Sequence, residues 1–283
     1  MRQIKGIHKA IYDPIDNLVT YRAMPTQSVG HIDPFLFLNH HGPQEYPPGN
    51  QGLPFGPHPH RGFETLTFIF QGDLMHYDSE HGKSIIRAGG IQWMTAGKGL
   101  VHVEVSSEEF KKTGGNAELI QLWFNLPAHL KMTEPGYTGL QKNDIPEVSL
   151  SGNSVLLHVV SGTWNGTKGI VDSKTGIGVV SMEMKKDSKY ETQISTERNI
   201  LFYVVTGNVM VNGQKAMKHD LVEFGPINEK ITIVALDDSI LLFGHGKPFN
   251  EPIVARGPFV MNYEAEIKQA WLDYQLGKMG SLD

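Results

Sequence analysis

The sequence predicts an all-β protein in which one sandwich or barrel module is used twice. Apolar and polar residues alternate in most segments, as in residues 64–70, and the segments stop at Gly, Asn or Asp. This is the period of a half-buried strand, and many short strands at close spacing indicate a sandwich or a barrel. Residues 68–75 resemble residues 203–210, and a turn and a further strand follow each stretch. We therefore expect a duplication.

The chain length supports the same division. It has 283 residues, which is a prior of about two domains at about 150 residues each. Proline and glycine interrupt the strand pattern between residues 131 and 148, so we predict domains at 1–132 and 133–283. A short helix is expected at about 262–277, because apolar residues recur there at helical spacing. They are Ile267, Ala270, Trp271 and Tyr274.

Composition excludes several classes of function. Lys and Arg number 25 and Asp and Glu 30, a net charge of −5, which argues against nucleic acid or an anionic membrane as a partner. The absence of cysteine excludes disulfides and thiolate metal sites and leaves 13 histidines as the nitrogen ligands. No apolar run has membrane-spanning length, and the start lacks the apolar core of a signal peptide. We expect a cytoplasmic protein.

Two pairs of residues could bind a metal. His58 and His60 flank a proline, and in extended chain such residues project to the same side, roughly 6.6 Å apart at the backbone. His102 and Glu104 repeat this i, i+2 spacing. Either pair alone is better explained as a surface loop or a strand ion pair. Together they supply three imidazoles and one carboxylate, a set that suits iron(II), manganese, nickel, cobalt or copper with open coordination positions.

The same segments resemble the pirin family, a branch of the cupin superfamily. The resemblance covers nearly the whole chain, and its most specific part is the histidine segment. The matching stretches are residues 33–36, 58–65, 92–99, 102–104, 121–127 and 257–262.

This resemblance implies a bicupin, with two antiparallel, jelly-roll-like β-barrels and a metal in the N-terminal barrel alone. The family's four ligands fall on His58, His60, His102 and Glu104. Glu64 stands where many other cupins have a glutamate ligand; in pirins it is not one, so we expect it in packing or around the site. The other histidines near the site are expected on the surface or around the ligands. They are His40, His41, His76 and His81.

The internal repeat predicts a second barrel without metal. A shift of 135 superposes Gly72 on Gly207 and places Gln193 and Ser195 opposite the two histidines of the first pair. Residues 231–235, opposite the second pair, contain no ligand. The second barrel is therefore expected to be structural or to bind a protein partner.

Pirin-like proteins include bacterial enzymes that oxidise the flavonol quercetin with dioxygen and a nuclear regulator that depends on iron. The resemblance therefore implies a quercetin 2,3-dioxygenase-like oxidoreductase whose substrates are a small aromatic polyphenol and O2. Glu104, the only ionisable oxygen ligand, is the candidate catalytic base. The expected cofactor is one divalent metal, iron(II) first, with Mn, Ni, Co, Cu or Zn as alternatives. A metal- or redox-sensing regulator and a purely structural bicupin are the competing hypotheses.

Overall fold

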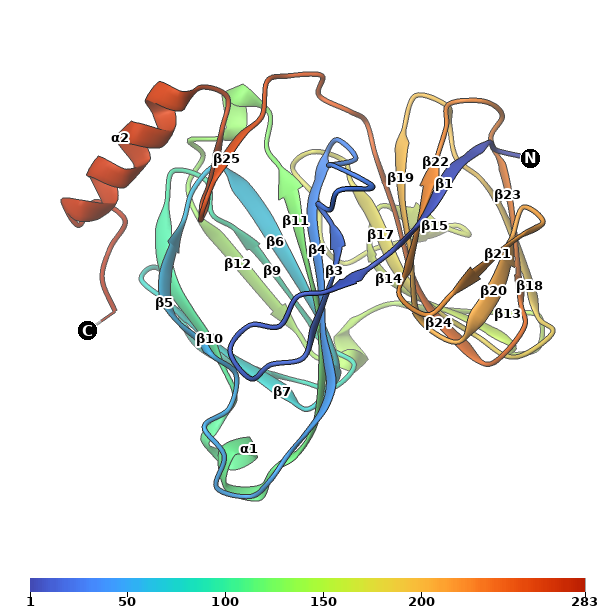
Figure 1. Cartoon of the computed structure of the whole chain (residues 1–283), viewed down its shortest axis with the longest axis horizontal. Coiled ribbons are helices and arrows are strands. Elements are labelled where there is room, and N and C mark those ends of the chain that lie inside the picture. Colours follow the sequence, from blue (N-terminus) through green and yellow to red (C-terminus); the bar gives the residue numbers. More distant parts are fainter. Residues whose placement is uncertain (283) are drawn as a thin grey trace. The chain divides into compact units, whose positions relative to one another are not determined.

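The computed structural model describes residues 1–282, which form two compact units. Unit 1 comprises Met1–Ile11, Arg22–Leu36 and Asp144–Pro248. Unit 2 comprises Tyr12–Tyr21, Phe37–Asn143 and the chain from Phe249 onward. Each unit is built around a seven-stranded sheet and a four-stranded sheet (Figure 1). The all-β class with two jelly-roll-like barrels is confirmed.

The seven-stranded sheet of unit 2 has the order β12-β9-β6-β11-β4-β3-β2, and its smaller sheet has the order β5-β10-β7-β8. A separate hairpin joins β25 and β26. The strands are β2 (Ile11–Tyr12), β3 (Thr20–Met24), β4 (Phe35–Tyr46), β5 (Phe55–His60), β6 (Phe63–Gln71), β7 (Asp73–Asp78), β8 (Gly82–Arg87), β9 (Ile91–Thr95), β10 (Leu100–Val105), β11 (Gly115–Asn125), β12 (Gly136–Leu140), β25 (Val254–Arg256) and β26 (Phe259–Met261).

The sheets of unit 1 follow the same plan, with orders β1-β22-β19-β24-β17-β14-β13 and β18-β23-β20-β21, beside a small β15-β16 hairpin. Its strands are β1 (Ile4–Lys9), β13 (Glu147–Leu150), β14 (Val155–Ser161), β15 (Thr163–Trp164), β16 (Thr167–Lys168), β17 (Gly178–Met184), β18 (Lys189–Gln193), β19 (Asn199–Thr206), β20 (Asn208–Val211), β21 (Gln214–Met217), β22 (Asp220–Phe224), β23 (Lys230–Ala235) and β24 (Ser239–Gly246).

The two similar stretches of sequence occupy equivalent strands. Gly72 joins β6 to β7 and Gly207 joins β19 to β20, with φ values of 80° and 79°. Only glycine adopts such a conformation at little cost, which explains why both copies have it at this turn. In each unit the first strand of the pair lies between two antiparallel neighbours, β9 and β11 for β6 and β22 and β24 for β19.

The helices are few and short. α2 (Glu264–Gln275) is the predicted C-terminal helix; it lies beside β25 in unit 2 (Figure 1), and Ile267 and Ala270 are buried against Phe259 and Met261. Trp271 is 40% exposed but contacts the Phe259 ring edge-on at 4.9 Å. α1 (Glu108–Thr113) was not expected, because six residues are too few to show helical periodicity. None of the described helices is long and apolar enough to span a membrane.

The units differ from the contiguous domains predicted at 1–132 and 133–283. The chain from Phe249 onward, including α2, belongs to the unit that contains the first barrel, and Met1–Ile11 belongs to the unit that contains the second. β1 extends the second barrel by pairing with β22. A break in the strand pattern marks where one module ends, but it does not reveal which module a terminal segment will join.

Candidate metal centre

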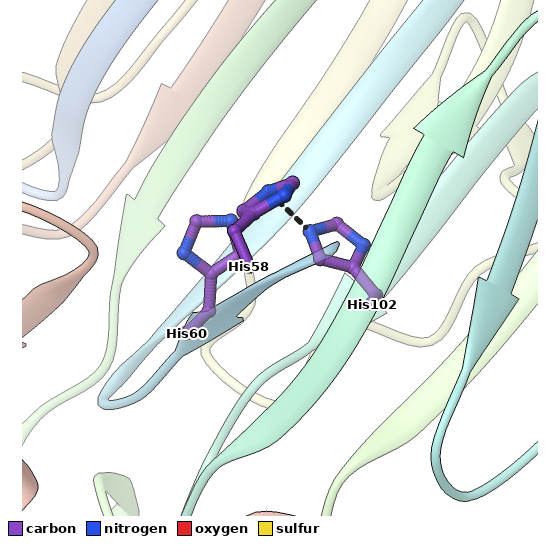
Figure 2. A group of neighbouring side chains, drawn as sticks. All are labelled: His58, His60 and His102. Atoms are coloured by element: carbon purple, nitrogen blue, oxygen red, sulfur yellow. Dashed lines mark hydrogen bonds between the residues drawn. The ribbon is translucent and has the colours of Figure 1, made fainter. Parts of the chain in front are cut away.

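Two neighbouring strands of unit 2 present the three predicted histidine ligands. β5 pairs antiparallel with β10, and His58 lies directly opposite His102. Prolines at positions 57 and 59 keep β5 extended, so His58 and His60, two residues apart, share a face. Figure 2 shows the three imidazoles turned toward one another. The sequence prediction that His58, His60 and His102 lie together agrees with the geometry.

The spacing of the three rings suits a single metal ion. Nε2 of His58 is 2.8 Å from Nε2 of His102 (Figure 2), and one nitrogen of each histidine lies within 4.8 Å of the others. Ring centroids are 4.3 to 4.9 Å apart. Two nitrogens at about 2.1 Å from one ion and at right angles are about 3 Å apart. The nitrogen separation is therefore compatible with neighbouring ligands of one ion.

Hydrogen bonds and burial leave ligand lone pairs on these rings. Nδ1 of His58 donates to the Gly56 carbonyl at 2.7 Å, and Nδ1 of His60 donates to the Pro258 carbonyl at 3.2 Å, so each Nε2 is unprotonated in the neutral ring. Burial, reinforced by His58, lowers the pKa of His60 to about 3. Burial likewise holds the pKa of His102 well below its usual value. Neutral imidazoles are the form that binds a metal.

Glu104 is not part of this group of three histidines. Its carboxylate forms a second potential ligand group with His102 and His76, and it is not within 4.8 Å of all three predicted histidines. Gln121 Nε2 donates to its Oε2 at 2.8 Å, and Gln92 Nε2 donates to its Oε1. His102 therefore belongs to both groups, and the prediction that all four residues bind one ion stays a prediction.

His76 was expected on the surface or around the ligands, and it is fully buried beside His102. Its Nδ1 lies 3.5 Å from Nδ1 of His102, and its Nε2 donates to Asp78 Oδ2 at 2.7 Å. Burial by itself would raise the pKa of Asp78, but the hydrogen bonds from His76 and from two backbone amides outweigh it and lower the pKa to about 2. The Tyr137 ring stacks on His76 at 4.1 Å.

Glu64 lies outside both potential ligand groups among the described residues. It is 1% exposed, and its Oε1 accepts a hydrogen bond from Thr95 Oγ1 at 2.6 Å. This position is consistent with the expected role in packing around the site. The sequence had no signal for the roles of Gln92 and Gln121, although both lie in strands that resembled the family.

Distant segments of unit 2 fix the corner that follows His60. A Cβ on Gly62 would lie 2.0 Å from the Val260 carbonyl oxygen, so β26 approaches closely only because residue 62 is glycine. Lys131 is 1% exposed and donates to the Gly62 and Val260 carbonyls and to Asn125 Oδ1, at 2.8 to 3.0 Å. These contacts tie β5, and with it His60, to the C-terminal segment.

Arg61 forms a further tie between this corner and α2. Its Nη1 donates to Asp273 Oδ2 at 2.8 Å, and its Nε donates to the Lys98 carbonyl at 2.5 Å. Arg61 is 5% exposed, and a guanidinium in such a position needs both partners to offset its lost hydration. The helix thus helps to hold the strand that presents two of the histidines.

A small cavity borders Glu104 inside the barrel. It has a volume of about 10 Å³, and Phe55, Thr67 and Gln121 are among its lining residues. This is about the smallest space that holds one water molecule. His58 is only half-buried, whereas His60 and His102 are buried, so the site opens toward solvent on the side of His58.

The equivalent positions of unit 1 have other chemistry. Gln193 ends β18 and Ser195 follows it, and both are exposed. The residue opposite Gln193 in the β18–β23 ladder is Lys230, at the position that His102 has in the first barrel. Lys230 forms an ion pair with Glu191 at 3.1 Å. Within residues 1–282, the groups of three or more potential metal ligands both include His102.

Comparisons with known proteins find relatives over nearly the whole chain. The Pirin family model matches residues 17–124, and the model of the Pirin C-terminal cupin domain matches residues 179–280. A protein of Pseudomonas aeruginosa with the provisional name quercetin 2,3-dioxygenase is 34% identical over 94% of this chain and 91% of its own length. A pirin-like protein of Solanum lycopersicum is 36% identical over 94% of this chain and 88% of its own.

A solved structure extends the similarity to the whole fold. The crystal structure of quercetin 2,3-dioxygenase from Acinetobacter baumannii is 34% identical, covers 100% of both chains and superposes with a TM-score of 0.94. The sequence identity, the coverage and the order of the two matched domains all agree with the resemblance seen in the motifs. This chain belongs to the pirin family.

Proposed function

We propose that this chain is a metal-dependent dioxygenase that cleaves a flavonol such as quercetin with O2. The convergence of His58, His60 and His102 on one point is the observation that carries the proposal. The full-length similarity to quercetin 2,3-dioxygenase from Acinetobacter baumannii supports the choice of reaction. The fold alone would not, since one fold serves many activities.

In this proposal each ligand has a defined role. His58, His60 and His102 would hold the ion through Nε2, and Glu104 would provide the fourth ligand. When bound, a divalent metal lowers the pKa of a coordinated hydroxyl and provides positions for substrates. Glu104 accepts the proton of the flavonol hydroxyl. Gln92 and Gln121, which donate to both of its oxygens, orient the carboxylate for that transfer.

Iron(II) is the proposed metal, because neutral imidazoles and a carboxylate with open positions suit iron and O2 chemistry. Mn, Ni, Co, Cu and Zn are alternatives that the same donor atoms accept. Elemental analysis of purified protein, followed by reconstitution with each metal in turn, identifies the ion that supports turnover. The expected result is one metal per chain, with the greatest O2 uptake for iron(II).

The test of the activity is a paired assay on metal-loaded protein. Bleaching of the quercetin absorption and consumption of O2 should occur together, since the reaction uses both substrates. His60→Asn should lose bound metal and both signals. His158→Asn is the matched control, because His158 lies on β14 of unit 1 and contacts Glu183 there. A metal-loaded wild-type protein that gives neither bleaching nor O2 uptake contradicts the proposal.

The small cavity beside Glu104 favours a second candidate, a metal- or redox-sensing regulator. A space for about one water molecule is too small for a flavonol. A regulator would bind metal without turning over quercetin and would differ between its two iron oxidation states. Hydrogen exchange measured on the iron(II) and iron(III) forms separates the two candidates. If the protein turns over quercetin and its exchange rates are the same in both forms, regulation by the iron oxidation state is excluded.

A further inference from the structure

The second barrel has a cavity at the corner that corresponds to the metal centre of the first. The shift of 135 that aligns Gln193 with His58 also aligns Arg198 with Phe63. Strand pairing gives a second equivalence. Thr65 in β6 pairs with Trp123, and Ile200, the equivalent residue of β19, pairs with His245. His245 is therefore equivalent to Trp123. Phe63 and Trp123 pack at 4.4 Å beside His60. Arg198 and His245 replace this aromatic pair.

Arg198 and His245 line a cavity of about 170 Å³ in unit 1. Trp164 and Tyr190 also line it, as does Gln193 at the end of β18. No acidic side chain is among the lining residues. The volume is close to that of an engineered cavity of about 150 Å³ that accepts benzene. The cavity can therefore hold a compact organic molecule.

The guanidinium of Arg198 carries a positive charge with no carboxylate partner among residues 1–282. Its Nε donates to His245 Nδ1 at 2.6 Å, and its Nη2 donates to the carbonyls of Gly176 at 2.5 Å and His245 at 3.2 Å. Nη1 has no acceptor within the described chain. The acids nearest in sequence are engaged with lysines, as Glu197 is with Lys247 at 3.2 Å.

A second guanidinium adds to the positive potential. Arg2 is 2% exposed and donates to the carbonyls of Ile194, Ser195 and Arg198. It too has no ion-pair partner in the described structure, although Glu229 lies near enough to favour its charge. Partly buried charges without a counter-ion are costly, and an anion placed among them offsets that cost.

We propose that this cavity of the second barrel binds a small organic carboxylate, about the size of benzoate. The planar guanidinium of Arg198 recognises a carboxylate group through its free Nη1. The Trp164 and Tyr190 side chains provide the apolar wall for the rest of the ligand. Since unit 1 provides all of these residues, the proposal does not depend on the metal of the first barrel or on its activity.

Calorimetric titration of the metal-loaded, full-length protein with benzoate, benzamide and inorganic phosphate tests the proposal. Benzoate should bind at least about tenfold more tightly than benzamide, its neutral analogue, because a charged hydrogen bond contributes about 1.5 to 3 kcal/mol. Benzoate should also bind more tightly than phosphate. Equal binding of benzamide, tighter binding of phosphate, or no binding of benzoate would each overturn the assignment.

Variants locate the binding. Gln193→Glu adds a negative charge at the exposed end of β18 without changing side-chain size, and it should weaken benzoate binding about fivefold, the effect of two like charges about 4 Å apart in water. Gln214→Glu, the same change at an exposed position of β21 that does not line the cavity, should have no effect. Arg198→Gln should abolish binding. Arg198 also donates to backbone carbonyls, so its replacement can disturb the fold. Gln193 is exposed, and the Gln193→Glu variant is therefore the decisive test. If this variant binds benzoate as tightly as the wild type, the proposed site is refuted.

Discussion

Replacing Asp78 by asparagine should weaken metal binding, although Asp78 is not a proposed ligand. Oδ1 of Asp78 accepts bonds from the amides of residues 80 and 81, and Oδ2 accepts from His76 Nε2. The protonated Nε2 leaves Nδ1 of His76 as an acceptor, 3.5 Å from Nδ1 of His102. His102 then carries its proton on Nδ1, and its Nε2 lone pair faces His58.

The asparagine reverses this chain of protons. The two backbone amides require an oxygen, so the carboxamide oxygen of the new side chain stays with them and its NH2 group faces His76. His76 must then accept through Nε2 and carry its proton on Nδ1, which obliges His102 to accept through Nδ1 and to be protonated on Nε2. A protonated Nε2 cannot bind metal. Loss of such an outer partner weakens metal affinity about 10- to 100-fold, or about 1.4 to 2.7 kcal/mol.

The assay is competition for metal between the protein and a chromophoric chelator at constant pH. Asp73→Asn is the matched control, because Asp73 also lies buried on β7 and also accepts bonds from a backbone amide and a hydroxyl, those of Ser107. The control should lose stability but keep its metal affinity. If Asp78→Asn binds metal as tightly as the wild type, or if both variants weaken it equally, the tautomer argument is refuted.

Three further predictions concern stability. Lys131→Met leaves three buried acceptors without their donor, which costs about 1 to 3 kcal/mol each. The free energy of unfolding measured in urea should therefore fall by about 3 kcal/mol or more. A decrease below about 1 kcal/mol would contradict this. Gly62→Ala should lower the melting temperature more than Gly82→Ala, because both have φ near 85° but only residue 62 meets backbone within 4 Å; equal effects would contradict it. Burial, and then Arg198, lowers the pKa of His245 to about 4 in the folded protein, so the unfolded chain binds the extra proton between about pH 6.5 and 4. His245 should contribute up to about 3 kcal/mol to the loss of stability as the pH drops through this window, in addition to the contributions of the buried His60 and His102. The His245→Gln variant should therefore lose less stability than the wild type over this window, and identical pH profiles would refute the assignment.

The regular features of the fold were predictable because they are local. Alternation of apolar residues depends on the two faces of a strand, and the glycine at positions 72 and 207 depends on one backbone angle. The His58 and His60 pair was predictable for the same reason, since the flanking prolines fix an extended chain whatever the rest of the protein does. Local rules of this kind need no knowledge of distant contacts.

Other features of the site depend on contacts that no local pattern records. The group of Glu104 with His76 arises because β7 pairs with β10, which places His76 opposite Glu104. Asp78 matters only because that pairing buries it beneath His76. Likewise, helical spacing identified α2, but its contacts with unit 2 include the bond between Arg61 and Asp273, which are 212 residues apart. These features were missed because they depend on contacts between residues far apart in the sequence, although the residue types themselves were visible.

The two barrels show how one architecture can be given opposite electrostatic character at the same corner. In the first barrel, buried neutral imidazoles present lone pairs, so the corner is suited to a cation. In the second, Arg198 stands at the position of Phe63 and bonds to His245, and the positions of His58 and His60 hold Gln193 and Ser195, which bring no charge. The result is a corner with an unmatched positive charge, suited to an anion. The strands and the turn of the duplicated module are kept, whereas the side chains at this corner differ in the charge that they carry.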